Sequence, residues 1–220
     1  MKYITLPVFT TILLTLLIFP NLQAQESKNN DKATTILDAA SSNIQKNKTM
    51  KVEFTYIMEN KEAKLKESRQ GTAFISGEKY RINIAGQVII NDGKTLYTYL
   101  PESKEVQIND AAESDNSMSP TSILSSYKKN YRAKFIKEEK AGKSTLMHID
   151  LIPLQGKNFF RIRVVVDNTA SMPVSFAIHD KSGSIFTYQI DKLQSNIDIP
   201  ASMLSFKPSD YPGVEVIDMR

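Results

Sequence analysis

The stretch that decides the fold runs from Val88 to Pro101 and reads V-I-I-N-D-G-K-T-L-Y-T-Y-L-P. Its two apolar halves flank the segment N-D-G-K at 91–94, and Asn, Asp and Gly are the residues that tolerate the positive φ of a tight hairpin turn. The stretch therefore predicts two antiparallel strands joined by a short turn. Tyr97 and Tyr99 are two residues apart, so they share one face of the second strand.

The same period of two continues in both directions from this hairpin. Upstream, apolar residues alternate with polar ones across 50–58 and 80–84, with short polar or glycine turns between the strands. Downstream, strands are expected at 135–136, 146–152, 159–166, 174–179 and 184–190, and a last short element at 197–206. Turns recur roughly every ten residues, which indicates a meandering antiparallel sheet of about ten strands.

Two segments have a helical rather than a strand period. The apolar positions of 34–46 fall on one helical stripe, whereas the polar residues 25–32 are expected to fray. Ser119-Pro120 is typical of a helix start, with Ser as the N-cap and Pro at the first helical position. The helix that it opens carries three apolar residues on one side, namely Ile123, Leu124 and Tyr127.

The first 24 residues have the pattern of a secretory signal peptide. Lys2 gives a positive start, an apolar run extends to Phe19, Pro20 breaks it, and the small residue Ala24 lies at the expected cleavage site. The alternative is a membrane anchor, but the run is too short for a comfortable span and a polar flank follows it. We expect a soluble, exported protein whose mature part, 25–220, is one domain.

Composition excludes several classes of protein. The 220 residues are 41% hydrophobic and 24% charged, which is typical of a globular domain. The chain has no cysteine, which excludes disulfides, thiolate metal sites, thiol nucleophiles and a lipidated N-terminal Cys. Its two histidines, His148 and His179, lack metal-ligand spacing, so we expect no metal and no cofactor. The net charge of +4 is mild, and we expect no nucleic-acid partner.

No motif for catalysis is complete. Residues 92–95 resemble the end of a P-loop, but the first glycine of that motif would fall on Val88, in a strand–turn–strand context. The nucleophile elbow G-x-S-x-G is absent. His179 precedes Asp180, but adjacent residues on a strand point to opposite faces. We therefore expect a protein that is not an enzyme, with an exported hydrolase as the least supported alternative.

Bulky apolar side chains on amphipathic strands are the conspicuous feature. Tyr97 and Tyr99 share one strand face, and Phe186 and Tyr188 share another. Such a face must be covered by a second sheet, by helices or by a ligand. An ordinary core explains most of these residues, whereas a curved sheet around a cavity capped by the two helices is the sharper alternative. Periodicity does not choose between the two.

The sequence resembles the LolA family of periplasmic lipoprotein carriers. The clearest stretch, 90–101, is similar to the family hairpin V-S-D-G-K-T-L-W-x-Y-x-P, with Tyr97 where Trp is common. Residues 71–74 and 79–82 resemble G-x-F followed by G-K-F-R-W, and 50–56 resembles F-x-A-x-F-x-Q. Ser119-Pro120 with Ile123-Leu124 is similar to S-P-x-x-L-L, and 206–216 to F-x-P-P-x-G-V-x-V. These matches occur in chain order.

The resemblance implies a fold, a role and partners. The fold is mainly β with α: a curved, incompletely closed antiparallel half-barrel of about ten or eleven strands, with helices covering its concave apolar face. The role is that of a periplasmic carrier, a monomer, that takes acylated lipoproteins from an inner-membrane transporter and passes them to an outer-membrane acceptor. The alternative is a non-enzymatic half-barrel sensor, or a carrier for another lipid or a protein partner.

The resemblance also suggests an acyl groove, on one face of each matching strand and one side of the second helix. The expected groove residues are Val52, Phe54, Tyr56, Tyr80, Ile82, Ile84, Tyr97, Tyr99, Ile123, Leu124 and Tyr127. Family members carry an Arg before G-K-F-R-W that latches the lid. Here that position is Ser76 or Gly77, and neither donates a charged hydrogen bond. The chain therefore latches its lid differently or does not open and close in the family manner.

Overall fold

The structure is a computed structural model, and it describes residues 22–111 and 120–220. Most of the predicted signal peptide and the predicted N-cap Ser119 lie outside the described residues. Two helices are present, α1 (Leu22–Gln45) and α2 (Pro120–Asn130). The predicted helix start at Pro120 is confirmed.

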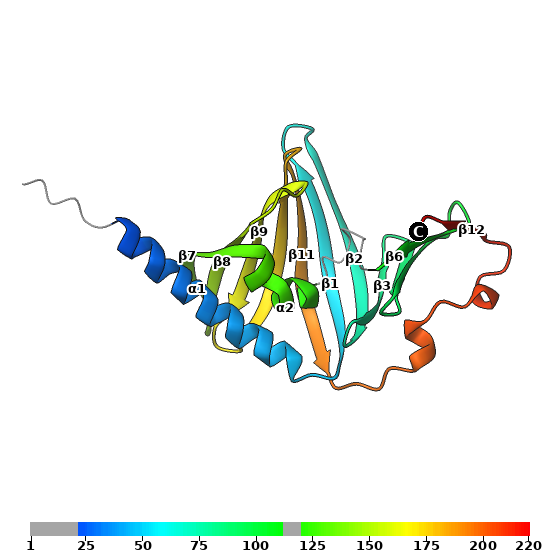
Figure 1. The fold of residues 1–220 in the computed structure, drawn as a ribbon, viewed down its shortest axis with the longest axis horizontal. Helices are drawn as coiled ribbons and strands as arrows, with labels where there is room; N and C mark the ends of the chain where they lie inside the picture. The colour runs from blue at the N-terminus through cyan, green and yellow to red at the C-terminus, as the bar shows by residue number, and fades with distance from the viewer. Residues whose placement is uncertain (1–21, 112–119) are drawn as a thin grey trace, which may run out of the picture.

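Twelve strands form one sheet (Figure 1). Their bounds are β1 Thr49–Asn60, β2 Leu65–Ser76, β3 Lys79–Ile84, β4 Gln87–Asn91, β5 Thr95–Leu100, β6 Glu105–Asp110, β7 Tyr131–Ala141, β8 Ser144–Pro153, β9 Phe159–Asp167, β10 Met172–Asp180, β11 Ser184–Ser195 and β12 Glu215–Asp218. The order across the sheet is β12-β6-β5-β4-β3-β2-β1-β11-β10-β9-β8-β7, so the edge strands β12 and β7 do not meet. The predicted fold class is confirmed: the protein is mainly β, an open half-barrel with two helices.

The strand count exceeds the ten or eleven expected, because β12 is a separate short strand. It has four residues and pairs in parallel with β6, whereas the other paired strands are antiparallel. Four residues are too few to show a reliable period of two. The segment 197–206 contains a 3₁₀ turn, η1 (Ala201–Leu204), and a second such turn, η2 (Pro208–Asp210), follows it.

The long strands β1 and β11 join the two arms of the meander at the centre of the sheet. They pair from Met50 opposite Ser195 to Asn60 opposite Ser184, with a bulge between Glu53 and Phe54. This pairing connects residues more than 120 positions apart in the chain. The arm β1–β6 and the arm β7–β11 therefore form one curved surface.

Helix α1 covers only one side of that surface. It contacts β7, β9 and β10, and α2 contacts α1 and β7. Figure 1 shows α1 crossing the side of the sheet formed by β7–β9 and ending below β1. Its apolar stripe is buried as predicted, with Ala33, Leu37 and Ala40 0% exposed. The expectation that 25–32 frays is wrong, since this segment lies within the 24-residue helix. It contains no Gly or Pro, and Gln, Glu and Lys are good helix formers.

The hairpin of 88–101 is confirmed in detail. The side-chain oxygen of Asn91 accepts a hydrogen bond from the Gly93 N–H at 2.7 Å. The Asp92 carboxylate accepts from the N–H groups of Lys94 (3.0 Å) and Thr95 (2.9 Å). Gly93 has φ +97°, which a residue without a Cβ adopts at little cost. The turn chemistry read from the sequence is therefore what fixes the register of β4 and β5.

A second, smaller apolar cluster lies on the convex face of β4–β6. Ile90, Val106 and Leu204 are 1%, 0% and 5% exposed. The C-terminal tail runs over this face, and Phe206 stacks on Tyr97 with ring centroids 4.8 Å apart. The sheet is therefore covered on opposite faces at its two ends: on the concave face by the helices and on the convex face by the tail.

Candidate ligand-binding cavity

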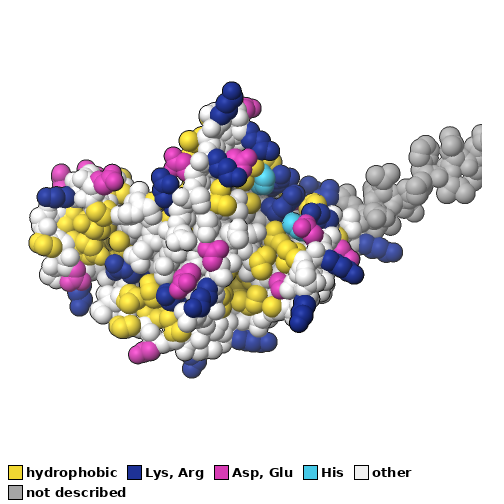
Figure 2. Space-filling view, turned by 180° about the vertical axis from the view of Figure 1, so that it is seen from behind, with side chains coloured by type: hydrophobic (Ala, Val, Ile, Leu, Met, Phe, Trp, Pro, Cys, Tyr) yellow, Lys and Arg dark blue, Asp and Glu magenta, His cyan; other side chains and the backbone are white. Residues whose placement is uncertain are grey.

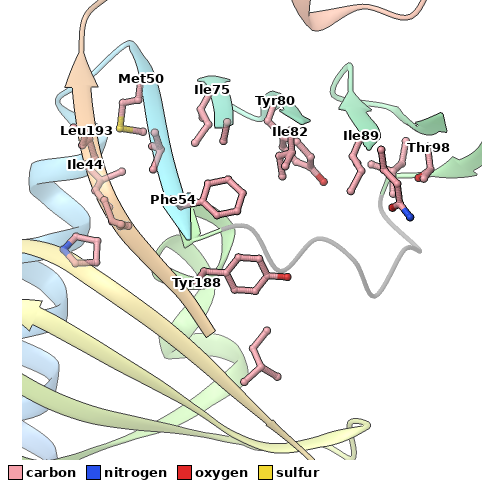
Figure 3. Close-up of a pocket in the computed structure, with 17 residues that line it drawn as sticks. Ile44, Met50, Phe54, Ile75, Tyr80, Ile82, Ile89, Thr98, Tyr188 and Leu193 are labelled. Carbon is pink, nitrogen blue, oxygen red and sulfur yellow. The ribbon is translucent and has the colours of Figure 1, made fainter. Parts of the chain in front are cut away.

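An apolar cavity of about 360 Å³ opens on the concave face, between the sheet and the C-terminal end of α1 (Figure 3). Among the residues that the structure describes, no charged side chain lines it. The lining residues are Ile44, Met50, Val52, Phe54, Ala73, Ile75, Tyr80, Ile82, Gln87, Ile89, Leu96, Thr98, Pro173, Ile178, Tyr188, Ile190 and Leu193. This size lies in the range of small-molecule sites, roughly 300–1,000 Å³.

Cross-strand rows of side chains build the cavity wall. In one row, Val52 lies opposite Ala73, Ala73 opposite Ile82, Ile82 opposite Ile89, and Ile89 opposite Thr98. Side chains that face one another across an antiparallel ladder lie on the same face of the sheet. The row therefore spans β1 to β5 as one continuous strip, most of it aliphatic.

Gly71 makes room for the largest ring in the wall. It lies opposite Phe54 in the β1–β2 ladder, and the Phe54 ring covers it. A Cβ on Gly71 would lie 2.4 Å from Phe54 Cζ, closer than van der Waals contact allows. The ring of Tyr188 lies next to Phe54 at a centroid distance of 6.0 Å. A glycine is thus required for this pair of rings to form the wall.

The two tyrosines of the cavity keep their protons. Burial, with a smaller contribution from Tyr56, raises the pKa of Tyr188 to about 12. Burial also raises the pKa of Tyr80, although a hydrogen bond with Asn91 acts in the opposite direction. Both hydroxyls are therefore neutral at physiological pH. The cavity offers an apolar surface with a few neutral hydrogen-bonding groups.

Six of the expected groove residues lie on the concave face of β1 and β3. Val52, Phe54, Tyr80 and Ile82 line the cavity. The other two, Tyr56 and Ile84, pack against the main core beside it. Tyr56 contacts Tyr188, with ring centroids 5.2 Å apart. The alternation of apolar and polar residues in the segments that resemble the family therefore indicated which face of β1 and β3 points inward.

Tyr97 and Tyr99 lie on the opposite face from the one expected. Tyr97 stacks on Phe206, and Tyr99 contacts Tyr211 at a centroid distance of 4.6 Å. Their neighbours Leu96 and Thr98 line the cavity instead. Both faces of β5 are apolar, because the tail covers the convex one. Alternation alone therefore could not say which face points inward.

The expected residues of α2 are buried in the core between the helices and the sheet. Ile123, Leu124 and Tyr127 are 3%, 2% and 3% exposed. The Tyr127 hydroxyl donates a 2.7 Å hydrogen bond to Asp38 of α1, and Lys128 pairs with the other oxygen of that carboxylate at 2.8 Å. These residues hold α2 to α1 rather than lining the cavity, to which the helices contribute Ile44.

The lining residues that sequence reasoning missed come mainly from β2, β4, β10 and β11. Ile75 and Ile89 follow the same alternation as their neighbours and could have been found from it. Ile178, Ile190 and Leu193 could not, because they reach the cavity only through the pairing of β11 with β1. The shared face of Phe186 and Tyr188 was the one local signal of this wall.

The helices are tied to the sheet on the side of β7–β10. Lys32 pairs with Glu138 at 3.2 Å and lies 3.9 Å above the Phe135 ring. Asn43 donates to the Ala170 carbonyl at 3.0 Å. Gly77, one of the two candidates for the latch position besides Ser76, has φ +58° and no atom within 4 Å of a built Cβ. The lid is therefore held at its β7–β10 side.

A polar cluster lies on the convex face behind the lid. Asp150, 5% exposed, accepts two hydrogen bonds from Arg163 at 2.7 and 2.9 Å, and pairs with Arg161 at 3.4 Å. Figure 2 shows Lys and Arg side chains beside both histidines on this side of the molecule. A buried carboxylate needs such partners to offset the cost of its desolvation. We therefore interpret this cluster as a structural ion-pair network.

Within residues 22–111 and 120–220, no group of three or more His, Asp or Glu side chains could hold a metal ion. Across the same residues, no helix has the length and apolarity needed to span a membrane.

The family model described as "Outer membrane lipoprotein carrier protein LolA" matches residues 45–207. A protein of Legionella pneumophila (strain Paris) named outer-membrane lipoprotein carrier protein is 25% identical over 174 residues, which cover 77% of this chain and 83% of the relative.

A solved structure with a TM-score above 0.5 shows the same fold. An uncharacterized conserved protein from Thermus thermophilus superimposes with a TM-score of 0.55 at 10% identity, covering 85% of this chain and 99% of that one. A LolA superfamily protein from Nitrosomonas europaea has a TM-score of 0.45 at 11% identity, with coverages of 79% and 97%.

Proposed function

We propose, since this chain belongs to the LolA family of outer-membrane lipoprotein carrier proteins, that it binds the acyl chains of lipoproteins in the concave cavity. The observation that carries the proposal is the cavity itself: about 360 Å³, with no charged side chain among the seventeen described residues that border it. An uncharged wall favours a hydrocarbon chain and disfavours a charged ligand, because a buried charge needs a partner.

The physical basis of carriage is the removal of acyl chains from water. Each CH₂ group that leaves water contributes about 0.8 kcal/mol, whether it enters a membrane or a protein. A carrier therefore has only to offer an environment comparable to the bilayer, and a lid that lets the chain pass. No bond is made or broken in such a cycle, and we propose a role without catalysis.

The proposed route runs through the periplasm, from an inner-membrane transporter to an outer-membrane acceptor. The name of the Legionella relative supports lipoproteins as cargo. Cleavage of the proposed signal peptide near Ala24 would fall in the first turn of α1 and leave its buried stripe, which begins at Ala33, intact. The mature chain, 25–220, would then carry the complete sheet and lid as one domain.

Binding is tested by adding a charge on one face of β3. Ile82→Glu puts a carboxylate into the cavity, and Asn83→Glu puts the same charge on the opposite face of the same strand. We expect a fluorescent fatty acid to bind the wild type and Asn83→Glu with equal affinity, and Ile82→Glu at least about tenfold more weakly. Equal binding by both folded variants would contradict the proposed site.

Carriage is tested separately. The purified protein is incubated with inner-membrane vesicles that contain lipoproteins and their transporter, and lipoproteins in the soluble fraction are measured. Release by the wild type and not by Ile82→Glu supports the shuttle. Acyl binding without release would instead support a carrier for another lipid, and a folded protein that binds no acyl probe would support a protein-binding sensor.

A further inference from the structure

A second hollow of about 270 Å³ adjoins the apolar cavity. It lies where three elements come together: the C-terminal end of α1 with residues 47–48, the turn between β2 and β3, and helix α2. We call it the vestibule. Four of the side chains that border it are exposed, so it reaches the molecular surface; these are Gln45, Lys48, Glu78 and Ser125.

The vestibule and the cavity share part of their wall. Ile44, Met50 and Ile75 border both spaces. They are 7%, 4% and 6% exposed, so they fill the boundary between the two. Met50 has an unbranched side chain that changes rotamer readily, and Ile44 sits on the last turn of the lid helix. Small side-chain movements would therefore join the two spaces into one.

The chemistry of the two spaces differs. The cavity is bordered almost entirely by apolar groups, whereas the vestibule is bordered in part by hydroxyl and amide groups from Ser41, Gln45 and Asn47. Gln45 donates to the Ser41 hydroxyl at 3.1 Å, and Asn47 donates to the Asn43 carbonyl at 3.0 Å. Lys48 and Glu78 add one charge of each sign, which leaves the vestibule without net charge.

Gly77 keeps one wall of the vestibule open. It has φ +58° in the β2–β3 turn, and a Cβ built on it would meet no atom within 4 Å. The space beside this turn position is therefore open. A polar group carried on the end of an acyl chain has room to leave the cavity here.

We propose that the vestibule is the subsite for the uncharged polar head of the bound lipid, the glyceryl ester and first peptide amides of a lipidated N-terminus. The acyl chain lies in the cavity, and the ester and amide groups exchange hydrogen bonds with Ser41, Gln45 and Asn47. This inference rests on the proposed function, because it needs an acyl chain in the cavity.

The test compares two probes on the purified protein: a fluorescent fatty acid, which needs the cavity alone, and a dipalmitoylglyceryl-cysteinyl tetrapeptide, which needs both spaces. Gln45→Trp fills the vestibule from an exposed position, and Lys46→Trp, at the next exposed residue, does not border it. We expect Gln45→Trp to weaken lipopeptide binding about tenfold while fatty-acid binding changes less than about twofold. Lys46→Trp should change neither.

The outcomes separate this inference from the proposed function. If Gln45→Trp weakens both probes equally, or neither, the vestibule is not a head-group subsite, although acyl binding stands. If dipalmitoyl phosphatidylglycerol, whose head is charged, binds more tightly than the lipopeptide, the preference of the vestibule for an uncharged head is contradicted. If the wild type binds no probe, the proposed function itself is contradicted, and with it the inference that rests on it. Ser125→Tyr, from the α2 wall, repeats the test should Gln45→Trp fail to fold.

Discussion

The two halves of the concave face have the same kind of side chains but differ in how deeply these are buried. On β8 and β9, the closed half, Leu151, Ile162 and Val164 are 0% exposed. On β1, β3 and β4, the open half, Val52, Ile82 and Ile89 are only partly buried and border the cavity. All six are aliphatic residues on period-two strands. The difference shows that coverage by the helices, and not strand composition, decides between core and cavity.

Geometry explains why only one half is sealed. A sheet of twelve strands spans roughly 50–60 Å along its curve, at about 4.8 Å between strands. Helix α1, with 24 residues, is about 36 Å long, and its first turns extend beyond the sheet in Figure 1. A single straight helix of this length cannot cover a curved surface of that width. The part left uncovered is the proposed binding site.

The sharpest test of this comparison truncates one aliphatic residue in each half. Leu151→Ala should lower the free energy of unfolding by about 3 kcal/mol, because it leaves a void in a sealed core. Ile82→Ala should cost about 1 kcal/mol, because part of Ile82 already faces open space. Urea unfolding measures both. Equal costs would show that the cavity is closed in solution.

A second, smaller effect is expected at Gly71, within the open half. Gly71→Ala forces the Phe54 ring to move, since the new Cβ would otherwise lie 2.4 Å from Cζ. We expect a loss of about 1–2 kcal/mol in stability, together with weaker binding of an acyl probe.

Gly156→Ala is the matched control for this substitution. No atom lies within 4 Å of a Cβ built on Gly156, so both stability and binding should stay within error. Unchanged acyl binding by Gly71→Ala would mean that Phe54 is not part of the binding wall.

The smallest expected effect concerns pH and the two histidines on the convex face, on β8 and β10. Burial, helped by Lys137, lowers the pKa of His148, and burial, helped by Arg161, lowers that of His179. The folded state thus binds fewer protons than the unfolded state below the ordinary histidine value of 6.5, so stability is complete above that pH and is lost as pH falls toward the folded pKa values.

We expect a lower urea midpoint at pH 5.5 than at pH 7.5, and a smaller difference in the double variant His148→Gln/His179→Gln. The carboxylates whose pKa is lowered, such as Asp167, lose their contribution mainly below pH 5 and do not interfere. A wild-type midpoint that does not change between the two pH values would contradict the prediction.

Sequence reasoning succeeded where the signal is local. The turn at 91–94 specified the hairpin through hydrogen bonds between neighbouring residues, and the alternation of 50–58 and 80–84 chose the inward face. It failed at Tyr97 and Tyr99, because both faces of β5 are covered, by different segments. It missed Leu193 and Ile190, because their neighbours on β1 lie more than 120 residues away in the chain.

The sequence by itself determined most of the strands and the core of both helices, since each depends on residues within a few positions of one another. Only the tertiary structure decided which strand faces point inward, how much of the concave face α1 seals, and that a polar vestibule adjoins the cavity. Those properties come from pairing and packing between distant segments. Such long-range contacts produce no periodic pattern in the local sequence from which they could be predicted.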